Sequence, residues 1–433
     1  MEELLAARLM MAISLGFHIV FASIGMAMPF FMLVSHYRYL KTNDSLDLKL
    51  TKLWSRGVAI LFATGAVSGT VLSFELGLLW PRFMEKAGPI FGMPFSWEGT
   101  AFFLEAIALG IFLYGWDRLN PRLHWLSGLA VGVSGFVSGV FVLSANAWMN
   151  APQGFDWNNG KPTSIDPVAA MFNPAWLQQS VHMQLAAFTA TGFAVAGIHA
   201  FYLSRGINIK LNRRALKIAL SFGAASALLM PLSGHYSAQW VAKNQPVKLA
   251  AMEALYKTQH RAPLLIGGIP DDESETVGWG IELPGALSFL AFNDFDAKVQ
   301  GLEEVPVAER PPVLITHLAF QVMVGIGSLL AFLALWSLSK LLRKREFGSL
   351  LLNILMVATP LGFIAIEAGW VVTEVGRQPW IIYGYLKTKD SVTQVPGMQY
   401  HLLLFTAIYL FLAYMCYFLM KRMIQTANKE TMS

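Results

Sequence analysis

The chain has 433 residues, of which 55% are hydrophobic and only 14% are charged, whereas soluble domains have about 25% charged residues. This composition excludes an ordinary soluble protein and indicates one that spans a membrane. The formal net charge of +5 by itself fits nucleic-acid binding, but most of the 32 Lys and Arg residues fall in alternate loops between apolar segments. Such a distribution orients a protein in a membrane, so no nucleic-acid partner is expected.

Nine apolar segments of about 20 residues follow one another along the chain, each long enough to cross a bilayer as an α-helix. They lie at roughly 9–35, 54–76, 96–116, 123–147, 180–203, 214–234, 312–340, 349–375 and 399–420. We therefore predict an all-α integral membrane protein with nine transmembrane helices, six in 1–234 and three in 312–433. A polar stretch, 235–311, forms an outer loop between them. The basic residues place the N-terminus outside and the C-terminus in the cytoplasm.

Cys416 is the only cysteine in the sequence. A single thiol excludes a disulfide within the chain, a CxxCH haem attachment and an iron–sulfur cluster. Any redox cofactor must therefore be held without a covalent bond to cysteine.

Ionisable or metal-ligating side chains interrupt the apolar segments. Each is a functional candidate, because a charged group in hydrocarbon costs about 2.5–3.5 kcal/mol on insertion scales. Counted from the expected outer ends of their spans, five of these residues fall in the outer part of the membrane. The five are His18, Glu98, His182, Met323 and Glu374.

Each candidate also has a structural interpretation. A membrane histidine often hydrogen-bonds a neighbouring helix, Met323 can be ordinary core packing, and Glu374 can form a structural i,i+3 ion pair with Arg377. Together, however, the residues favour redox chemistry, because a His–Met ligand pair holds a haem iron six-coordinate and suited to electron transfer. Glu98 and Glu105, seven residues apart on one helix face, provide a line of carboxylates for protons.

The eighth segment ends in Gly376-Arg377-Gln378-Pro379-Trp380. Pro379 cannot continue the helical hydrogen bonding, so the helix is expected to stop near Gln378. This leaves Arg377 and Trp380 at the membrane interface, close to Glu374. An anionic or metallic group is expected within reach of this helix end.

The stretch from Glu367 to Trp380 resembles the signature of subunit I of the cytochrome bd-type quinol oxidases, and the resemblance extends over nearly the whole chain. Further matching motifs occur in the family's order. They are Phe17-His18, Gly69 to Trp80, Glu98-Gly99, Phe102 to Glu105, Ala145-Asn146 with Trp148-Met149, Val181-His182, Gln245-Pro246, Lys248, Ala250 to Glu253, and Met323-Val324-Gly325.

The resemblance implies a fold of two four-helix bundles plus one peripheral helix, the first bundle lying in 1–150 and the second beginning near 180. It implies that 235–311 is an outer quinol-binding loop. A homologous second membrane subunit is expected as partner, with small single-helix subunits as a further expectation. The location implied is the bacterial cytoplasmic (inner) membrane.

The resemblance also implies three haems: a low-spin haem b, a high-spin haem b, and either haem d or a further haem b. His182 and Met323 match the ligands of the low-spin haem. His18 and Glu374 match the ligands of the two high-spin haems, and which residue serves which haem stays open. Trp370 matches a tryptophan that lies among the haems.

The activity implied is oxidation of ubiquinol or menaquinol at the outer face and reduction of oxygen to water with protons taken from the cytoplasm. Lys248 and Glu253 match the quinol-oxidising loop, where a carboxylate can accept a quinol proton. Glu98 is expected close to the oxygen-reducing iron and Glu105 deeper on the proton path. Arg377 balances the charge of the ligand carboxylate.

Two features depart from better-studied family members. The outer loop is short, as in the cyanide-insensitive branch, and Gln321 stands where those members have an arginine. Without that cation the low-spin haem is expected to have a lower reduction potential, unless another charge substitutes for it.

A second hypothesis is a proton-coupled membrane transporter that uses the intramembrane Glu and His residues as an ion path. Such transporters carry short or Gly/Pro-broken spans at corresponding places in their two halves. The sequence does not show that pattern, which weakens this hypothesis.

Overall fold

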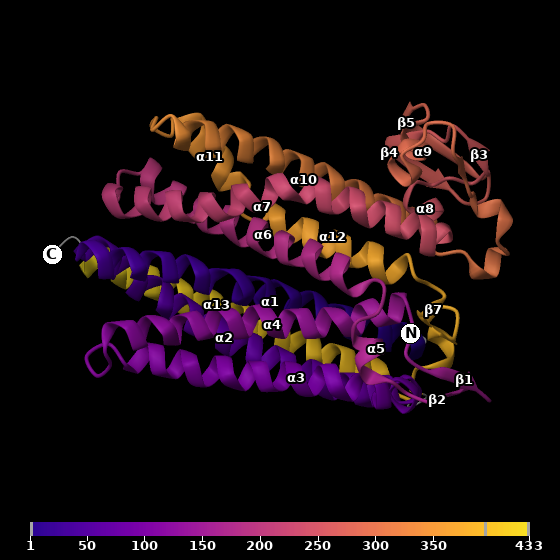
Figure 1. The fold of residues 1–433 in the computed structure, drawn as a ribbon, viewed down its shortest axis with the longest axis horizontal. Helices are drawn as coiled ribbons and strands as arrows, with labels where there is room; N and C mark the ends of the chain where they lie inside the picture. Colours follow the sequence, from indigo (N-terminus) through magenta and orange to yellow (C-terminus); the bar gives the residue numbers. More distant parts are fainter. Residues whose placement is uncertain (1–2, 394–395, 431–433) are drawn as a thin grey trace.

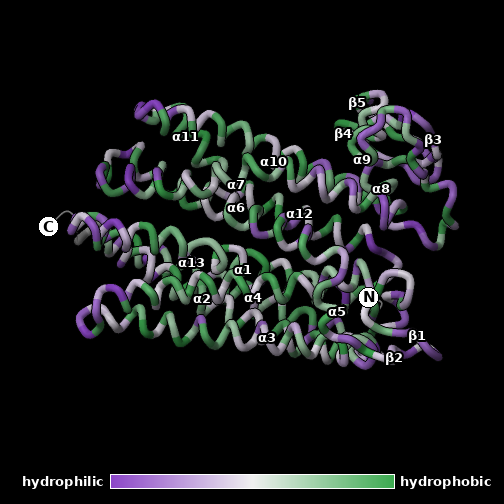
Figure 2. Tube along the Cα trace, in the orientation of Figure 1, coloured by the Kyte–Doolittle hydropathy of each residue, from purple (hydrophilic) through white to green (hydrophobic). Residues whose placement is uncertain are grey.

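The structure, a computed structural model, describes residues 3–393 and 396–430, with side chains to Ala427. Within these residues nine helices are long and apolar enough to cross a membrane. They run side by side, and hydrophilic residues gather towards the two ends of the assembly (Figures 1 and 2). The prediction of an all-α protein with nine membrane helices is therefore confirmed for the described part of the chain.

The nine spans contain ten of the helices labelled in Figure 1, because the eighth span is broken into two. They are α1 (Glu3–Thr42), α2 (Ser45–Leu79), α3 (Pro81–Tyr114), α4 (Pro121–Asn150), α6 (Trp176–Ser204), α7 (Ile209–Asn244), α10 (Val313–Leu342), α11 (Ser349–Val357), α12 (Leu361–Val375) and α13 (Met398–Glu430). The short helices between them are α5 (Pro167–Met171), α8 (Pro246–Met252) and α9 (Ala286–Phe292).

The long helices pack in two groups. Helices α1 to α4 contact one another and form the N-terminal helix group, while α6, α7, α10, α11 and α12 form the C-terminal helix group. Helix α6 contacts α1 and α4 and so joins the groups, and α13 packs on α1 and α2. The closure of each group into a four-helix bundle stays a prediction.

Two predicted spans have different limits in the structure. The third helix begins at Pro81 rather than near 96, because proline at the first position is compatible with a helix start and the helix continues through Pro89 and Pro94. The predicted limits put Glu98 near the outer start of this span, whereas in the structure it lies well inside α3. The eighth span is interrupted between α11 and α12 at Pro360, whose ring nitrogen cannot donate a helical hydrogen bond.

The predicted outer loop, 235–311, is partly helical and partly sheet. Its first ten residues continue α7 to Asn244. Beyond α8 the chain forms an antiparallel hairpin of β4 (Leu264–Asp271) and β5 (Thr276–Leu283), and β3 (Gln259–His260) pairs with β6 (Lys298–Val299). Two further two-stranded ribbons are β1 (Asp156–Asn158) with β2 (Lys161–Thr163), and β7 (Trp380–Ile382) with β8 (Leu386–Lys387). The labelled strands and the N-terminus lie at one end of the molecule, here called the strand end, and the C-terminus lies at the other (Figure 1).

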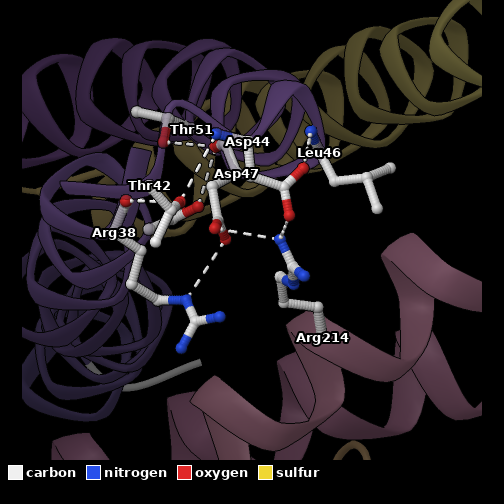
Figure 3. Close-up of polar contacts among 8 residues, drawn as sticks. Arg38, Thr42, Asp44, Leu46, Asp47, Thr51 and Arg214 are labelled. Carbon is white, nitrogen blue, oxygen red and sulfur yellow. Dashed lines mark hydrogen bonds and ion pairs between the residues drawn. The ribbon is translucent and has the colours of Figure 1, made fainter. Parts of the chain in front are cut away.

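A polar cluster joins the two helix groups at the end opposite the strands (Figure 3). Asp44 caps α2 by accepting a hydrogen bond from the Leu46 amide, and Asp47 follows in the first turn with no exposed surface. Arg214 of α7 donates to carboxylate oxygens of both, at 2.5 Å from Asp44 and 2.9 Å from Asp47. Arg38 is a second partner of Asp47, at 3.3 Å. The buried carboxylate therefore depends on a cation from the other helix group.

We predict that Arg214→Gln lowers the free energy of unfolding by about 2–3 kcal/mol. The substitution leaves the buried carboxylate of Asp47 with Arg38, at 3.3 Å, as its remaining cation. Thermal denaturation of the detergent-solubilised protein measures the effect. Arg213→Gln is the matched control, since Arg213 pairs at 2.8 Å with Glu346, whose side chain is 72% exposed. Surface pairs contribute about 1 kcal/mol or less, so equal losses in the two variants would contradict the prediction.

Candidate functional site

The carboxylate of Glu374 is the best-connected of the predicted site residues. It lies in the last turn of α12, one turn before Arg377, and the guanidinium donates a hydrogen bond to Oε2. Its other oxygen, Oε1, accepts a hydrogen bond of 2.6 Å from Nδ2 of Asn146 on α4. The predicted contact between Glu374 and Arg377 is confirmed, and the helix ends at Val375, three residues before the predicted stop.

Arg377 is buried rather than placed at an open interface. It is 2% exposed, and its Nε and Nη1 make no hydrogen bond with any residue that the structure describes. A buried guanidinium with unused donors is suited to an additional anionic group, because unpaired buried donors are costly. The propionate carboxylates of a haem have this chemistry, so the environment of Arg377 fits a haem.

The two predicted histidine ligands have similar surroundings. Nδ1 of His18 is 2.9 Å from Oγ of Ser68 on α2, and Nδ1 of His182 is 3.1 Å from Oγ of Ser233 on α7. A hydrogen bond at one ring nitrogen fixes the ring and leaves the other nitrogen available to a metal. A Cβ at Gly69 would lie only 2.9 Å from Cε1 of His18, so glycine is required for the approach of this ring.

Met323 lies on α10 against α12. A Cβ at Gly369 would be 2.9 Å from its Sδ, and the next residue, Trp370, is half-buried one turn before Glu374. Nearby, the side-chain amide of Gln321 hydrogen-bonds the backbone of the outer loop. Its Nε2 donates to the Leu265 carbonyl and its Oε1 accepts from the Gly267 amide, both at 2.9 Å. At this position the side chain therefore joins β4 to α10.

The carboxylates of α3 both face α4. Glu105 is 7% exposed, and a Cβ at Gly135 would lie 3.2 Å from its carboxylate oxygens. Glu98 lies on the same face of α3, seven residues or about two helical turns before Glu105. Its Oε1 is 3.5 Å from Oγ of Ser138. The prediction that they share one face is confirmed. Across the described residues, no group of three or more His, Cys, Asp or Glu residues is close enough to hold a free metal ion.

Lys248 lies at the strand end, in a cavity of about 380 Å³ that it shares with Arg377, Trp380 and Tyr383. Its Nζ donates a hydrogen bond of 2.7 Å to Oδ1 of Asn150, the last residue of α4. Burial lowers the pKa of Lys248 to about 7; the positive charge of Arg377 lowers it too, and the negative charge of Glu374 opposes both.

Glu253 caps the other end of α8 and faces the outer loop instead. It is 1% exposed, and burial raises its pKa to about 8, an effect that the Leu265 backbone only partly opposes. Five residues of helix turn the chain by about 140° beyond one revolution, so Lys248 and Glu253 point in different directions. Among the described residues no hydrogen bond or ion pair joins these two predicted quinol-site residues.

Sequence reasoning missed two polar residues of this region. Asn150 was not singled out, and Asn146 was noted only within a motif. Both contacts involve residues far apart in sequence, since Asn146 and Glu374 are separated by 228 positions. The only local signal is that Asn146 and Asn150 are four residues apart, which places two amides on one face of α4.

Fold and site together define a polytopic α-helical membrane protein in which the Arg377–Glu374 ion pair and the asparagine amides bound to it lie near the strand end. The chain belongs to the family described as cytochrome bd terminal oxidase subunit I, which it matches over residues 6–428. It is therefore the first subunit of an oxygen-reducing membrane enzyme.

Relatives and a solved structure agree with this family. A putative cytochrome bd menaquinol oxidase subunit I of Bacillus subtilis is 40% identical over 94% of each chain. A cytochrome bd ubiquinol oxidase subunit 1 of the same species is 32% identical, over 96% of this chain and 91% of that one. The bd oxidase structure from Geobacillus thermodenitrificans is similar with a TM-score of 0.92 and 37% identity, over 98% of this chain and 99% of that one.

The raised pKa of Glu253 predicts a pH-dependent stability. A carboxyl group with a higher pKa in the folded than in the unfolded state favours folding at low pH, and this contribution is lost as pH rises from about 4.5 to about 8. The melting temperature of Glu253→Gln should therefore rise relative to wild type over that interval and level off above it. Glu273→Gln, at an exposed position in the β4–β5 turn, is the control. A constant difference between Glu253→Gln and wild type across the interval would refute the prediction.

Proposed function

We propose that this chain is the haem-bearing catalytic subunit of a membrane quinol:oxygen oxidoreductase that reduces oxygen to water. The observation that carries the proposal is the half-buried Glu374 carboxylate, held between Arg377 and Asn146 where a family haem ligand is expected. The relatives named as menaquinol and ubiquinol oxidases support quinol as electron donor. Either quinol is compatible with the proposal.

The proposed cofactors are three haems: a low-spin haem b, a high-spin haem b, and a haem d or further haem b. Bound haem supplies electron transfer and the site at which oxygen is reduced. His182 and Met323 would hold the low-spin haem, and His18 and Glu374 the high-spin ones. Ser68 and Ser233 hydrogen-bond the two imidazoles, Trp370 would lie among the haems, and the unused donors of Arg377 would bind an acidic haem side chain.

Proton delivery is assigned to α3. Oxygen reduction consumes protons, and Glu105 and Glu98 present carboxylates in succession along one face, about 10 Å apart along the helix axis. Ser138 can hold or pass a proton at Oε1 of Glu98. We propose that protons enter from the cytoplasm, with the N-terminus and the strand end outside and the C-terminus inside.

Quinol oxidation is assigned to the outer loop. The cavity beside Lys248 is large enough for a quinol ring, and Arg377, Trp380 and Tyr383 line it. Lys248 would orient a quinol oxygen. Burial raises the pKa of Glu253 to about 8, so it can accept a proton and release it outside.

The proposed partners are a homologous second membrane subunit and, in addition, small single-helix subunits, in the bacterial cytoplasmic (inner) membrane. Large apolar side chains such as Phe332, Leu335, Leu403 and Phe411 are exposed on α10 and α13. Such surfaces suit lipid or a second set of membrane helices.

The visible spectrum of the purified protein, with pyridine haemochrome analysis and quinol-dependent oxygen uptake, tests the proposal. Haem absorbance and oxygen consumption are expected, and the haemochrome distinguishes haem d from haem b. Absence of haem absorbance would instead support the transporter hypothesis.

Met323→Leu should convert the low-spin haem signal to a high-spin one, because the change removes the sulfur but nearly preserves volume and costs less than about 1.5 kcal/mol. Absorbance and electron paramagnetic resonance spectra measure the spin state. Met356→Leu, at another half-buried methionine in the C-terminal helix group, should leave the signal unchanged. An unaltered low-spin spectrum in Met323→Leu would refute the ligand assignment.

Glu105→Gln and Glu253→Gln separate the proposed proton path from the quinol site. Gln preserves size and removes the exchangeable proton, so Glu105→Gln should reduce steady-state oxygen consumption by at least tenfold while a single turnover of quinol oxidation survives. Glu253→Gln should slow that single turnover, and the reaction of the pre-reduced enzyme with oxygen should remain normal. Stopped-flow absorbance measures both steps. If both variants fail at the same step, the two paths are not separate.

A further inference from the structure

Asn150 occupies a junction between three elements of the strand end. It is 1% exposed and is the last residue of α4. Its Oδ1 accepts from Nζ of Lys248 at 2.7 Å, its backbone carbonyl accepts from Nε2 of Gln245 at 2.9 Å, and its Nδ2 donates to the Asn146 carbonyl at 3.1 Å. All of the polar atoms of the side chain are thus engaged.

The donors and acceptors determine how this amide is oriented. An ammonium group can only donate, so Lys248 requires the oxygen of Asn150, and the NH₂ group must face Asn146. Lys248 is buried, and the like charge of Arg377 lies nearby. Burial and this charge both disfavour the charged form of Lys248. The charge-assisted hydrogen bond that the ammonium donates to Oδ1 of Asn150 therefore stabilises its charged form.

The network continues from Asn150 to the proposed haem ligand. Nδ2 of Asn150 also lies 3.4 Å from Oδ1 of Asn146, and Nδ2 of Asn146 donates to Glu374 at 2.6 Å. Glu374 in turn accepts from Arg377. One continuous set of hydrogen bonds thus runs from the loop lysine on α8, through two amides of α4, to the carboxylate on α12.

We propose that Asn150 is a positioning residue that holds the Lys248 ammonium at the 380 Å³ cavity and connects it, through Asn146, to the Glu374 carboxylate. This inference rests on the proposed function of that cavity as the quinol site. It assigns two separable roles to one side chain: the oxygen orients the quinol-side cation, and the NH₂ group orients the amide that contacts the iron-ligand carboxylate.

A purely structural role predicts something different. The Gln245 side chain donates to the backbone carbonyl of Asn150 at 2.9 Å and to its Oδ1 only at 3.4 Å, so the shorter bond that closes α8 onto the end of α4 does not need the asparagine side chain. If Asn150 only terminates α4, side-chain substitutions should change stability without changing the interaction with quinol.

The test is a double-mutant cycle of Asn150→Leu and Lys248→Met in the intact oxidase complex, with a short-tail quinol analogue as substrate. Asn150→Leu should raise KM for the quinol about tenfold, the effect of losing one hydrogen bond to a charged group. Lys248→Met should raise it similarly, and the double variant should show no further rise, because residues that act through one another are not additive. Asn173→Leu is the control, since Asn173 is equally buried and its hydrogen-bond partners in the described part of the chain are backbone groups: it donates to the carbonyls of Ser144, Ala170 and Met171 and accepts from the Ala175 amide. Its KM should stay at the wild-type value.

Asn150→Asp tests the second role and guards against misfolding of the leucine variant. Asp has the same shape and keeps an acceptor for Lys248 but loses the donor to Asn146. KM should remain within about twofold of wild type, whereas the high-spin haem absorbance should shift, as it should in Asn150→Leu and not in Asn173→Leu.

A wild-type KM in Asn150→Leu, or additive effects in the cycle, would overturn the positioning role. An unshifted haem spectrum in both Asn150 variants would overturn the connection to Glu374. Two other results would contradict the proposed function itself. Either the wild-type protein does not oxidise quinol, or Lys248→Met leaves KM for the quinol unchanged. In that second case the spectrum of Asn150→Asp still decides whether the network reaches Glu374.

Discussion

The ion pair between the buried Arg377 and the half-buried Glu374 is the constraint on which the strand end of the molecule depends. A guanidinium that is 2% exposed is stable only beside an anion, because an unpaired buried charge costs several kcal/mol. The pair in turn fixes the end of α12 and gives Asn146 a charged partner. Burial lowers the pKa of Lys248, the nearby charge of Arg377 lowers it further, and the oxygen of Asn150 accepts a hydrogen bond from its ammonium group.

One face of α4 collects these contacts along the membrane. Gly135 faces Glu105, Ser138 faces Glu98, Asn146 binds Glu374 and Asn150 binds Lys248. Their spacing follows the helical repeat over about 22 Å. Small side chains let the α3 carboxylates lie close to the helix, and amides near its end bind the charged groups of α8 and α12. Helix α4 thus places the groups proposed for proton delivery and for quinol oxidation in one line without contributing an ionisable residue of its own to that line.

The sequence predicts what is set locally in this protein. Apolar length predicts nine spans, and helical periodicity correctly pairs Glu98 with Glu105 and Glu374 with Arg377. It predicts helix ends poorly where proline is ambiguous: Pro81 begins α3, Pro89 and Pro94 are tolerated within it, and Pro360 interrupts the eighth span. Periodicity also says nothing about partners distant in sequence, so the bonds from Asn146 to Glu374 and from Asn150 to Lys248 follow only from tertiary packing. The ligand assignments of His18, His182 and Met323 rest on family resemblance and remain predictions.

Burial disfavours the charged forms of the two loop residues Lys248 and Glu253. Burial raises the pKa of Glu253 to about 8 and lowers that of Lys248 to about 7, so near neutral pH each has a substantial neutral population. Groups that titrate close to the working pH can exchange protons with a substrate at small free-energy cost. Burial disfavours the charged forms of Lys248 and Glu253, and the same burial brings their pKa values into the range that proton transfer requires.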